Sequence, residues 1–486
     1  VAWSEGLLAP AERTLLQRLA VFVGGATLES IEAVCVAPVG AEPLPGDVLD
    51  HLGALLDQSL VRQREEPGGN PRFYLMHVIR EYALELLAAS GGADALSRAF
   101  FDHYLALGDA YLRVELSTWA SLEMKGWFER LEREYDNIRA ALGWAYERAM
   151  AAQTAGAAHG NDLLLEGLRL AGDLLWFWSS RGYLSERRTW LERFVALDAP
   201  DFQQVGERVR GDREALRVYA RALYGLGMVF MSQDDLNAAL EVEERSLRLF
   251  QAAGDVRGSL NPLGGLANLA LHRGELERAA SLYAEDLKVR RSEYGPIGTT
   301  DALVGLADLA LVEHEPERAL PFLEEALSLA IQAQEMHSQA IALEMQASIA
   351  LQRGQTDEAA GLARRALELV WASGRINQVD PALEHCAVVM TAQERHDAAA
   401  CLFGAADALR KRSGWGRTYV RVSLKEEIGS AESRVHAALG EEGWSAAFTA
   451  GQALSLEEAY QAALQVSPVA APLPPVDFSK VVNPKK

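Results

Sequence analysis

The first hundred residues combine stretches with helical spacing of apolar side chains and one stretch typical of strands. Apolar positions in Ala11–Phe22 predict a helix ended by Gly24 and Gly25, and Thr27 is placed to cap a second helix. A third helix is expected over Asp47–Gln58, after a connector rich in proline and glycine. The runs SLVRQR and PRFYLM then favour a β-hairpin, because the intervening EEPGGN supplies turn residues.

A final helix, HVIREYALELLAAS, follows the hairpin and completes the element order of a winged helix. A winged helix that reads DNA needs a cationic third helix in the major groove. Here the third helix carries Asp47, Asp50 and Asp57 and neither Lys nor Arg. Because these carboxylates would lie beside phosphates, the charge disfavours DNA reading and favours a protein–protein or intramolecular relay module.

Much of the remaining chain repeats every forty residues. Alanines recur at one position of the repeat, namely Ala239, Ala279, Ala319, Ala359 and Ala399. Twelve residues before each stands another small residue, namely Gly227, Ala267, Ala307, Ala347 and Ala387. Small residues at two such positions allow antiparallel helices to approach closely, while larger residues fill the neighbouring holes. Since one helix pair cannot bury both of its faces, the pairs are expected to stack into a solenoid.

The regions beside the repeats show weaker patterns. Arg169–Leu197 is expected to form a less regular helix pair, in which Arg187 replaces the alanine and loosens the packing. Phe128–Ala149 predicts a linking helix, and Ala151–Asp162 is the best candidate for an internal loop. Trp444–Leu464 is expected to cap the end of the solenoid.

Together these patterns predict a mainly α fold, in which an N-terminal winged helix precedes an α-solenoid of tetratricopeptide-like helix pairs with period 40. The expected organisation is a winged helix at 1–92, linker helices and irregular helix pairs at 93–215, repeats at 216–415, capping helices at 416–466 and a tail at 467–486. The tail is rich in proline and is expected to be disordered.

Composition narrows the classes of partner. The 486 residues carry a formal net charge of −21, which disfavours nucleic acid as the main partner. Three cysteines, Cys35, Cys386 and Cys401, are too few for a disulfide framework and favour a cytoplasmic protein. No long apolar window predicts a membrane span or a membrane partner. The chain begins at Val1 without an initiator Met, so we expect it to be a piece of a longer protein.

The sequence contains none of the common catalytic motifs. GxxxxGK[ST], HExxH, GxSxG and CxxC are all missing. The glycines of Gly225–Phe230 belong to the small-residue positions of a helix, and His396–Cys401 offers too few ligands for a metal site. We therefore expect that this chain is not an enzyme and holds no metal or cofactor of its own.

A solenoid offers a concave groove lined by the first helix of each pair, and this groove is the predicted binding site. The positions directed toward it are Arg221, Tyr224, Met228, Asn261, Asn268, His272, Asp301, Asp308, Glu344, Ser348, Gln352 and Glu384. The part at 221–272 is mixed polar and aromatic, which suits a peptide or small effector, whereas the part at 301–384 is acidic and suits a basic partner. The alternative is that each of these residues simply occupies a solvated helix face.

The two small positions twelve residues apart resemble the tetratricopeptide repeat, although that repeat usually has a period of about 34. Five ordered segments carry a wider resemblance, namely LAVFVGGATLESIEAVC, VLDHLGALLDQSLV, RFYLMHVIREYALELL, LEREYDNIRAALGWA and SERRTWLERFVAL. They resemble the C-terminal half of bacterial STAND-class signalling NTPases, including LuxR-type and SARP-type regulators. The resemblance extends over nearly the whole chain.

This resemblance implies that a nucleotide-binding domain precedes the winged helix in the parent protein, binds ADP or ATP, and is a partner of this chain. It also bears on His77, because relatives carry a Met-His-Asp motif whose histidine contacts the β-phosphate of ADP. Met76 and His77 match that motif, whereas Val78 does not. A histidine at a helix N-terminus also lies beside free N–H groups that favour anions. The alternative is a local contact with Glu81, one turn later.

The function implied is that of a relay and sensor, in which a peptide, protein or small effector in the groove biases an upstream nucleotide switch through the winged helix. One alternative is a protein-interaction scaffold without nucleotide switching. Another is a DNA-binding transcriptional regulator that acts through Asp47–Arg72. The resemblance leaves open whether activation brings oligomerisation.

Overall fold

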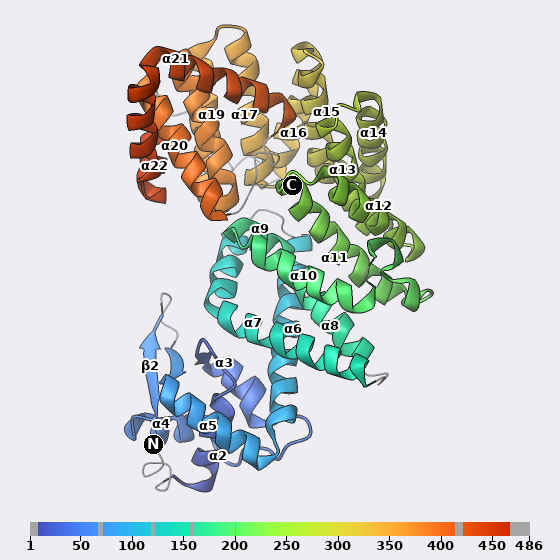
Figure 1. The fold of residues 1–486 in the computed structure, drawn as a ribbon, viewed down its shortest axis with the longest axis vertical. Coiled ribbons are helices and arrows are strands. Elements are labelled where there is room, and N and C mark those ends of the chain that lie inside the picture. The colour runs from blue at the N-terminus through green and yellow to red at the C-terminus, as the bar shows by residue number, and fades with distance from the viewer. Residues whose placement is uncertain are drawn as a thin grey trace, which may run out of the picture. The chain divides into compact units, whose positions relative to one another are not determined.

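The computed structural model describes residues 8–66, 71–117, 122–155, 160–199, 201–413 and 421–466. The chain divides into two compact units (Figure 1). The winged-helix unit comprises Val1–Leu116 and Gly126–Leu174, and the solenoid unit comprises Ser117–Lys125 and Leu175–Lys486. Within the described residues, no helix is both long enough and apolar enough to cross a membrane.

The winged-helix unit begins with the predicted order of helices and strands. Its elements are α2 (Pro10–Leu19), β1 (Ala26–Thr27), α3 (Leu28–Ile31), a π-helical turn (Glu32–Val36), α4 (Val48–Asp57), β2 (Val61–Glu65), β3 (Pro71–Leu75) and α5 (His77–Ser90). The strands form an antiparallel sheet in the order β1-β3-β2, with Gln63 opposite Phe73. The hairpin and the closing helix are confirmed, whereas the two-residue β1 leaves no pattern to predict it. The turn residues Gly68, Gly69 and Asn70 lie outside the described residues.

Local sequence signals explain where these helices begin and end. Thr27 accepts a hydrogen bond from the backbone N–H of Ser30 at 3.2 Å, and Asp47 accepts one from Leu49 at 2.7 Å. Both side chains satisfy N–H groups that have no partner within the helix. The first helix ends at Leu19, earlier than the glycine pair indicates, and Gly25 follows with a positive φ of 71°.

Three longer helices complete the winged-helix unit: α6 (Ala93–Ser117), α7 (Leu122–Thr154) and α8 (Gly160–Asp173). The linking helix predicted at Phe128–Ala149 is part of α7. The loop predicted at Ala151–Asp162 is too long, because α7 continues to Thr154 and α8 begins at Gly160. The alanine-rich run after Ala149 keeps the helix going, since alanine has the highest helix propensity.

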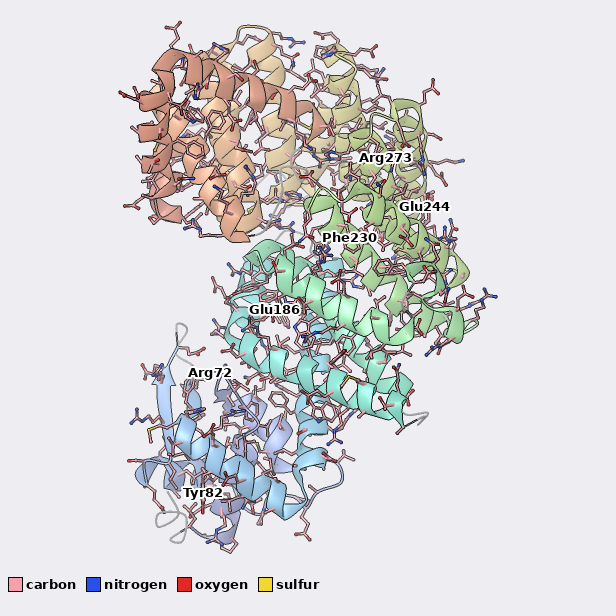
Figure 2. The ribbon with its side chains drawn as sticks, in the orientation of Figure 1. Arg72, Tyr82, Glu186, Phe230, Glu244 and Arg273 are labelled. Carbon is pink, nitrogen blue, oxygen red and sulfur yellow. The ribbon has the colours of Figure 1, made fainter. Side chains whose placement is uncertain are left out.

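A buried polar network joins the sheet to α7. Arg72 on β3, which Figure 2 labels, donates to both oxygens of Glu134, at 2.6 and 3.1 Å, and to two backbone carbonyl oxygens. Tyr104 and Asn137 also donate to Glu134, at 2.8 and 3.0 Å. Burial by itself would raise the pKa of Glu134, but the hydrogen bonds and charge of Arg72, with those two donors, hold it below its ordinary value. The LEREYDNIR segment therefore anchors the winged helix.

The solenoid unit consists mainly of stacked antiparallel helix pairs (Figure 1). Its helices, in chain order, are α9 (Leu175–Arg181), α10 (Leu184–Asp198), α11 (Arg213–Ser232), α12 (Leu236–Ala252), α13 (Val256–His272), α14 (Leu276–Glu293), α15 (Thr300–Val312), α16 (Pro316–Gln332), α17 (Met336–Gln352), α18 (Thr356–Ser373), α19 (Val379–Ala392) and α20 (His396–Ser413). All ten small residues of the two predicted columns are buried between paired helices. The solenoid of helix pairs with period 40 is thus confirmed.

The turns within the pairs share one backbone conformation. Residues forty apart at this turn adopt a positive φ of 59–73°, namely Asp234, Gly274, His314, Gly354 and Glu394. Only glycine adopts this left-handed conformation without a steric penalty. The tight turn is therefore kept in every repeat, even where its residue is not glycine.

Arg187 is packed more closely than its sequence position suggests. The guanidinium group donates to the backbone carbonyl oxygen of Gly225 and to the hydroxyl group of Ser179, and Arg187 is 0% exposed. The expectation of loose packing is wrong here, because the guanidinium fills the space between helices and satisfies buried acceptors. The range Arg169–Leu197, predicted to be one helix pair, contains the end of α8, followed by α9 and α10. The boundary between the two units falls within it, after Leu174.

The C-terminal part of the solenoid unit forms α21 (Val422–Gln452) and α22 (Leu456–Ala463). Both helices contribute to the apolar core around α18, α19 and α20, and so cover the last helix pair. Two glycines allow α20 and α21 to approach closely. A Cβ on Gly404 would lie 2.0 Å from the backbone oxygen of Phe448. A similar Cβ on Gly451 would lie 1.8 Å from the backbone oxygen of Cys401. The tail at 467–486, predicted to be disordered, lies outside the described residues.

Candidate functional site

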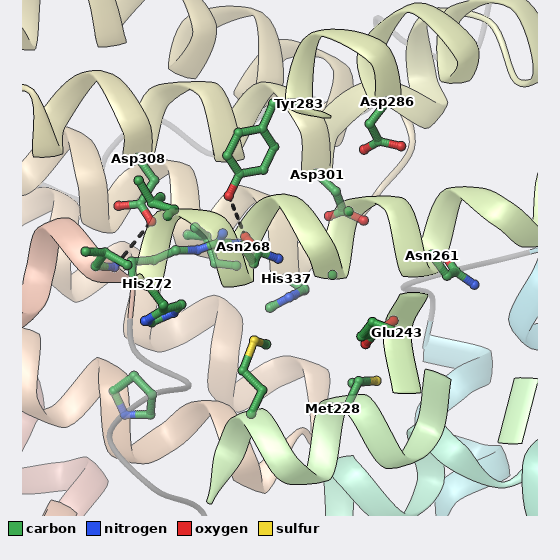
Figure 3. A pocket seen from close by; sticks show the side chains of 18 of the residues that line it. Met228, Glu243, Asn261, Asn268, His272, Tyr283, Asp286, Asp301, Asp308 and His337 are labelled. Carbon is green, nitrogen blue, oxygen red and sulfur yellow. Dashed lines mark hydrogen bonds between the residues drawn. The ribbon is translucent and has the colours of Figure 1, made fainter. Parts of the chain in front are cut away.

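A cavity with a volume of about 200 Å³ lies within the solenoid unit (Figure 3). Its walls come mainly from α11, α13, α15 and α17, the first helices of successive pairs, with α12, α14 and the start of α21. Eight of the residues that the repeat pattern directs to the groove line this cavity: Tyr224, Met228, Asn261, Asn268, His272, Asp301, Asp308 and Glu344. The structure therefore brings residues from four repeats into one site.

The other four predicted groove residues do not line the cavity. Ser348 is buried, and its hydroxyl donates to Glu427 of α21 at 2.5 Å. Glu384 is also buried and pairs with Arg410 at 2.5 Å. Arg221 is half-buried and Gln352 is exposed at the end of α17. Counting along the repeat cannot separate these positions from the cavity, because it does not include contacts made by other helices, and in particular the helix that covers Ser348.

That covering helix is α21, whose first turn is held by Asp308 of α15. Asp308 accepts hydrogen bonds from the backbone N–H groups of Val422 and Ser423, at 3.3 and 3.1 Å, and from the Ser423 hydroxyl. The residue before α21, Arg421, provides no side-chain cap of its own. Asp308 thus caps α21 from another helix, 114 residues away in sequence, and its negative charge complements the helix dipole.

A second contact joins α21 to the same part of the cavity. The Nζ atom of Lys425 lies 3.4 Å from Nδ1 of His272. Burial, followed by the charges of Lys425 and Arg421, lowers the pKa of His272 to about 3. The imidazole is therefore neutral near pH 7, and its Nδ1 can accept a hydrogen bond from the ammonium group.

The opposite side of the cavity is acidic. Asp286 and Arg290 form an ion pair at 2.8 Å, with both groups almost buried. Burial raises the pKa of Asp286 to about 6, even though Arg290 opposes the shift. The hydroxyl of Tyr283 donates to Oδ1 of Asn268 at 2.6 Å, as Figure 3 shows. These groups are satisfied by neighbours in the cavity wall.

Glu243 differs from these satisfied groups. It is 2% exposed and lines the cavity from α12, yet its Oε2 atom has no hydrogen-bond partner. Two glycines make room for the carboxyl group, because a Cβ on Gly227 would lie 2.3 Å from Oε1 and one on Gly265 would lie 2.9 Å away. Burial raises the pKa of Glu243 well above its ordinary value, although Arg187 acts in the opposite direction. Burial therefore favours the neutral form of this acid.

Glu243 has a sequence signal that the motif search misses. The residues forty apart in the same column are Tyr283, Leu323, Ala363 and Phe403. A carboxylic acid at a position that is apolar or aromatic in the other repeats marks a break in the packing pattern. Tyr283 lies against Gly305 of the next repeat, as Glu243 lies against Gly265, so the two side chains occupy equivalent positions.

Two further titratable groups line the cavity from α17. Burial raises the pKa of Glu344 to about 8, although Arg421 opposes the shift. Burial also lowers the pKa of His337 well below its ordinary value, and its Nδ1 atom has no hydrogen-bond partner. Shifts of this kind concentrate at sites that bind or react.

His77, the predicted nucleotide-contacting residue, lies in the winged-helix unit at the first position of α5. Its side chain is 78% exposed, and Nε2 lies 3.2 Å from Oε1 of Glu81. The alternative predicted for this histidine, a local contact with Glu81, is thus present. The N-cap residue of α5, Met76, makes no side-chain capping bond, so the first N–H groups of the helix have no side-chain cap from it.

Metal chemistry has no candidate centre in the described residues. There, no group of three or more His, Cys, Asp or Glu side chains is placed to hold a metal ion. Cys35 and Cys386 are buried, and burial raises the pKa of each thiol. The residues that line the cavity offer hydrogen bonds and charges to a ligand.

Comparison with known proteins adds information about the winged helix. Residues 8–88 match the winged helix-turn-helix domain family. The protein named "Putative HTH-type transcriptional regulator" in Mycobacterium tuberculosis, and its namesake in Mycobacterium bovis, are each 36% identical to this chain over 195 residues, or 40% of this chain. The chain spans 20% of the length of these curated relatives.

Two solved structures are similar to this chain at low identity. A STAND protein with a tetratricopeptide repeat sensor from Pyrococcus horikoshii has a TM-score of 0.41 at 13% identity, covering 95% of this chain and 66% of that chain. A Rap protein in complex with Competence and Sporulation Factor has a TM-score of 0.43 at 10% identity, covering 75% of this chain and 99% of that chain. Residues 8–88 thus form a winged helix-turn-helix domain, and the chain that contains it is similar to mycobacterial proteins named as regulators.

Proposed function

We propose that this chain is the relay and ligand-sensing region of a larger regulator of the STAND type. The solenoid binds a peptide, protein or small effector in its cavity, and the winged helix couples that event to an upstream nucleotide-binding domain. The observation that carries the proposal is the cavity itself, where polar side chains from four repeats converge around the unpartnered acid Glu243.

The arrangement of the cavity supports a sensing role. Neighbouring repeats pack mainly on each other, so the curvature of a solenoid depends on small rotations at each interface. A ligand in the cavity contacts α11, α13, α15 and α17 at once, and also Arg421 at the start of α21. It therefore stabilises one curvature over others, which is how binding shifts a conformational equilibrium.

Selection from a displayed library of random peptides tests groove binding. Asn261 lines the cavity and is half-buried, so Asn261→Arg adds bulk and charge to the site with little strain. The matched control is Asn237→Arg at an exposed position of α12. Peptides selected by the natural chain should bind Asn261→Arg at least about tenfold more weakly. They should bind Asn237→Arg with the same affinity as the natural chain. Equal binding by both variants would remove the groove as the binding site.

Nucleotide coupling needs a separate experiment on the parent protein, in which we propose that ADP is bound at rest and ATP on activation. His77 is exposed and could reach a phosphate only by giving up its contact with Glu81. Native mass spectrometry should find copurified ADP in the parent protein and less of it in His77→Ala. Retention of ADP in His77→Ala at the natural level would remove this role, and absence of nucleotide from both proteins would favour a scaffold without switching.

Transcriptional regulation through DNA contact is the second candidate, favoured by the names of the mycobacterial relatives. Arg62 and Arg64 are exposed on β2, where the wing of a winged helix contacts phosphates. The carboxylates of α4 and its cap oppose this role, because Asp47, Asp50 and Asp57 are all exposed. Salt-sensitive duplex binding that is lost on replacing both arginines by glutamine would support it, and no binding at low salt would exclude it.

A further inference from the structure

The acidic end of the cavity contains a carboxyl group that is built into the wall but left unpaired. Glu243 is 2% exposed, and Gly227 and Gly265 leave just enough space for its carboxyl group. The Oε2 atom accepts no hydrogen bond from the described residues. Buried polar atoms without a partner are rare in folded proteins because each costs free energy. An acid kept in this state is therefore explained best by a partner that arrives from outside the chain.

The nearby arginines are engaged with other acceptors. The guanidinium of Arg187 donates to the carbonyl oxygen of Gly225 and to the hydroxyl of Ser179. Arg290 donates to both carboxylate oxygens of Asp286, at 2.8 and 2.9 Å. Neither arginine forms an ion pair with Glu243, so this end of the cavity keeps an excess of acid.

Asp301 adds a second acid to the same space. It stands on α15, is exposed, and lines the cavity. Figure 3 shows the carboxyl groups of Asp301 and Glu243 reaching into the cavity from different helices. Tyr224 lies within electrostatic reach of both acids and presents an aromatic ring to the cavity. Two acids and an aromatic ring are the groups that surround ammonium and guanidinium ions in proteins.

We propose that the part of the cavity between Glu243 and Asp301 binds an ammonium group carried by the ligand. This inference rests on the proposed function of the cavity as the sensing site and names the ligand's chemical class. The bound cation donates a hydrogen bond to Oε2 of Glu243, and the carboxyl proton passes to solvent water as the ion pair forms. Asp301 supplies the second negative charge at the cavity mouth.

Three cations and their neutral counterparts serve as probes, so that different sources of the cation are distinguished. Butylamine represents a free amine, N-acetyl-lysinamide represents a lysine side chain, and triglycine amide represents a peptide N-terminus. The neutral counterparts are butanol, N-acetyl-norleucinamide and N-acetyl-triglycine amide. Titration calorimetry on the full chain should show at least one cation binding about tenfold or more tightly than its counterpart, because a charge-assisted hydrogen bond is lost in the latter.

Two variants and one control locate the binding. Glu243→Gln keeps the shape of the side chain and removes the acid, and it should lower the affinity for the cation about tenfold or more. Asp301→Asn, at an exposed position, should weaken it in the same direction without risk to the fold. Glu277→Gln removes the same charge from an exposed position of α14 outside the cavity, and affinity should stay unchanged.

Each contrary outcome has a defined meaning. The inference is overturned if no cation binds below about 20 mM, if the neutral counterpart binds as tightly, or if both acid variants bind the cation as the natural chain does. When one of these results occurs while displayed peptides still require the site around Asn261, the sensing function stands and only the cation is excluded. If neither peptides nor cations bind in the cavity, both proposals fall.

Discussion

Glu134 in the winged-helix unit and Glu243 in the solenoid unit are buried to a similar extent, with 6% and 2% of each residue exposed. Glu134 receives hydrogen bonds from Arg72, Tyr104 and Asn137, and its pKa lies below the ordinary value. Glu243 has an oxygen without a partner, and its pKa lies well above the ordinary value. Burial is the same in both cases, so the partners decide whether the acid carries a charge.

This contrast separates a structural acid from a binding acid. A charged group that is fully hydrogen-bonded fixes one arrangement of its neighbours, as Glu134 does between the sheet and α7. A neutral acid with free capacity can accept a ligand and change its charge on binding, as we propose for Glu243. The predictions below test this difference, beginning with the largest expected effect.

Removal of Glu134 should produce the largest loss of stability. Glu134→Ala leaves the guanidinium of Arg72 buried without its counter-ion, which should destabilise the winged-helix unit by about 3–5 kcal/mol. Chemical denaturation, followed by amide exchange of β3, measures the change. Glu132→Ala removes an exposed acid from the same helix and should cost less than about 0.5 kcal/mol. Equal losses in the two variants would show that the network does not hold the unit together.

The stability of the solenoid unit should fall as the pH rises from 6.5 to 8. Glu344 has a folded pKa of about 8, so when folded it keeps most of its proton until the pH approaches 8, whereas when unfolded it is deprotonated throughout this range. The unfolded state therefore binds fewer protons, and Glu344 alone accounts for a loss of about 2 kcal/mol. His272, His337 and His385 have depressed pKa values, so near pH 6.5 they bind fewer protons when folded than when unfolded, and they oppose this trend at the lower end of the range but little above about pH 7.5.

The matched variant for the pH experiment is Glu344→Gln. It should make the free energy of unfolding less dependent on pH, because the difference in bound protons between the folded and unfolded states falls by about one. Glu134 behaves with the opposite sign, because its depressed pKa means that its contribution is lost only as the pH falls below about 4.5. Thermal unfolding across the range, with amide exchange to separate the two units, gives the measurement. A slope that Glu344→Gln leaves unchanged would contradict the assignment.

Asp308 is an intermediate case, since its partners are backbone N–H groups of another helix. Asp308→Ala should free the first turn of α21 and destabilise the solenoid unit by about 1–2 kcal/mol, the usual effect of losing a helix cap. Asp301→Ala on the same helix, at an exposed position, should cost less than about 0.5 kcal/mol. Faster amide exchange at Val422–Lys425 in Asp308→Ala alone would confirm the cap, and similar exchange in both variants would contradict it.

The smallest change is expected for Glu243→Gln. An acid that is already neutral and unpaired loses little when it becomes an amide, so stability should change by less than about 1 kcal/mol. The same substitution at Glu134 removes a charge that faces Arg72, and it should cost at least about 2 kcal/mol. If both substitutions cost the same, the proposed difference between the two acids is wrong.

The sequence is sufficient to predict the architecture because the relevant patterns are local. Thr27 and Asp47 cap the helices that they precede, and the hairpin lies between two short β-prone runs. Columns of small residues forty apart then predict the stacking of the pairs. These signals come from backbone and packing requirements that repeat over a few turns of helix.

The candidate site could be predicted only in part. Counting from the small-residue column finds Tyr224, Asp301 and Asp308 because they share a helix face with known geometry. It does not reveal that Asp308 meets Val422, since no local pattern links residues 114 apart. Glu243 was detectable as the acidic member of an otherwise apolar or aromatic column, but only once the column is compared across repeats.

The course of α21 has a consequence for folding. Contacts in a stack of repeats are local in sequence, so such stacks usually unfold from their ends one repeat at a time. Here the chain returns from the last pair to the middle of the stack, where Asp308 holds its first turn, while the far end of α21 packs on α20. The pairs enclosed by this return are tied into a single cooperative unit, whose terminal helices open only together.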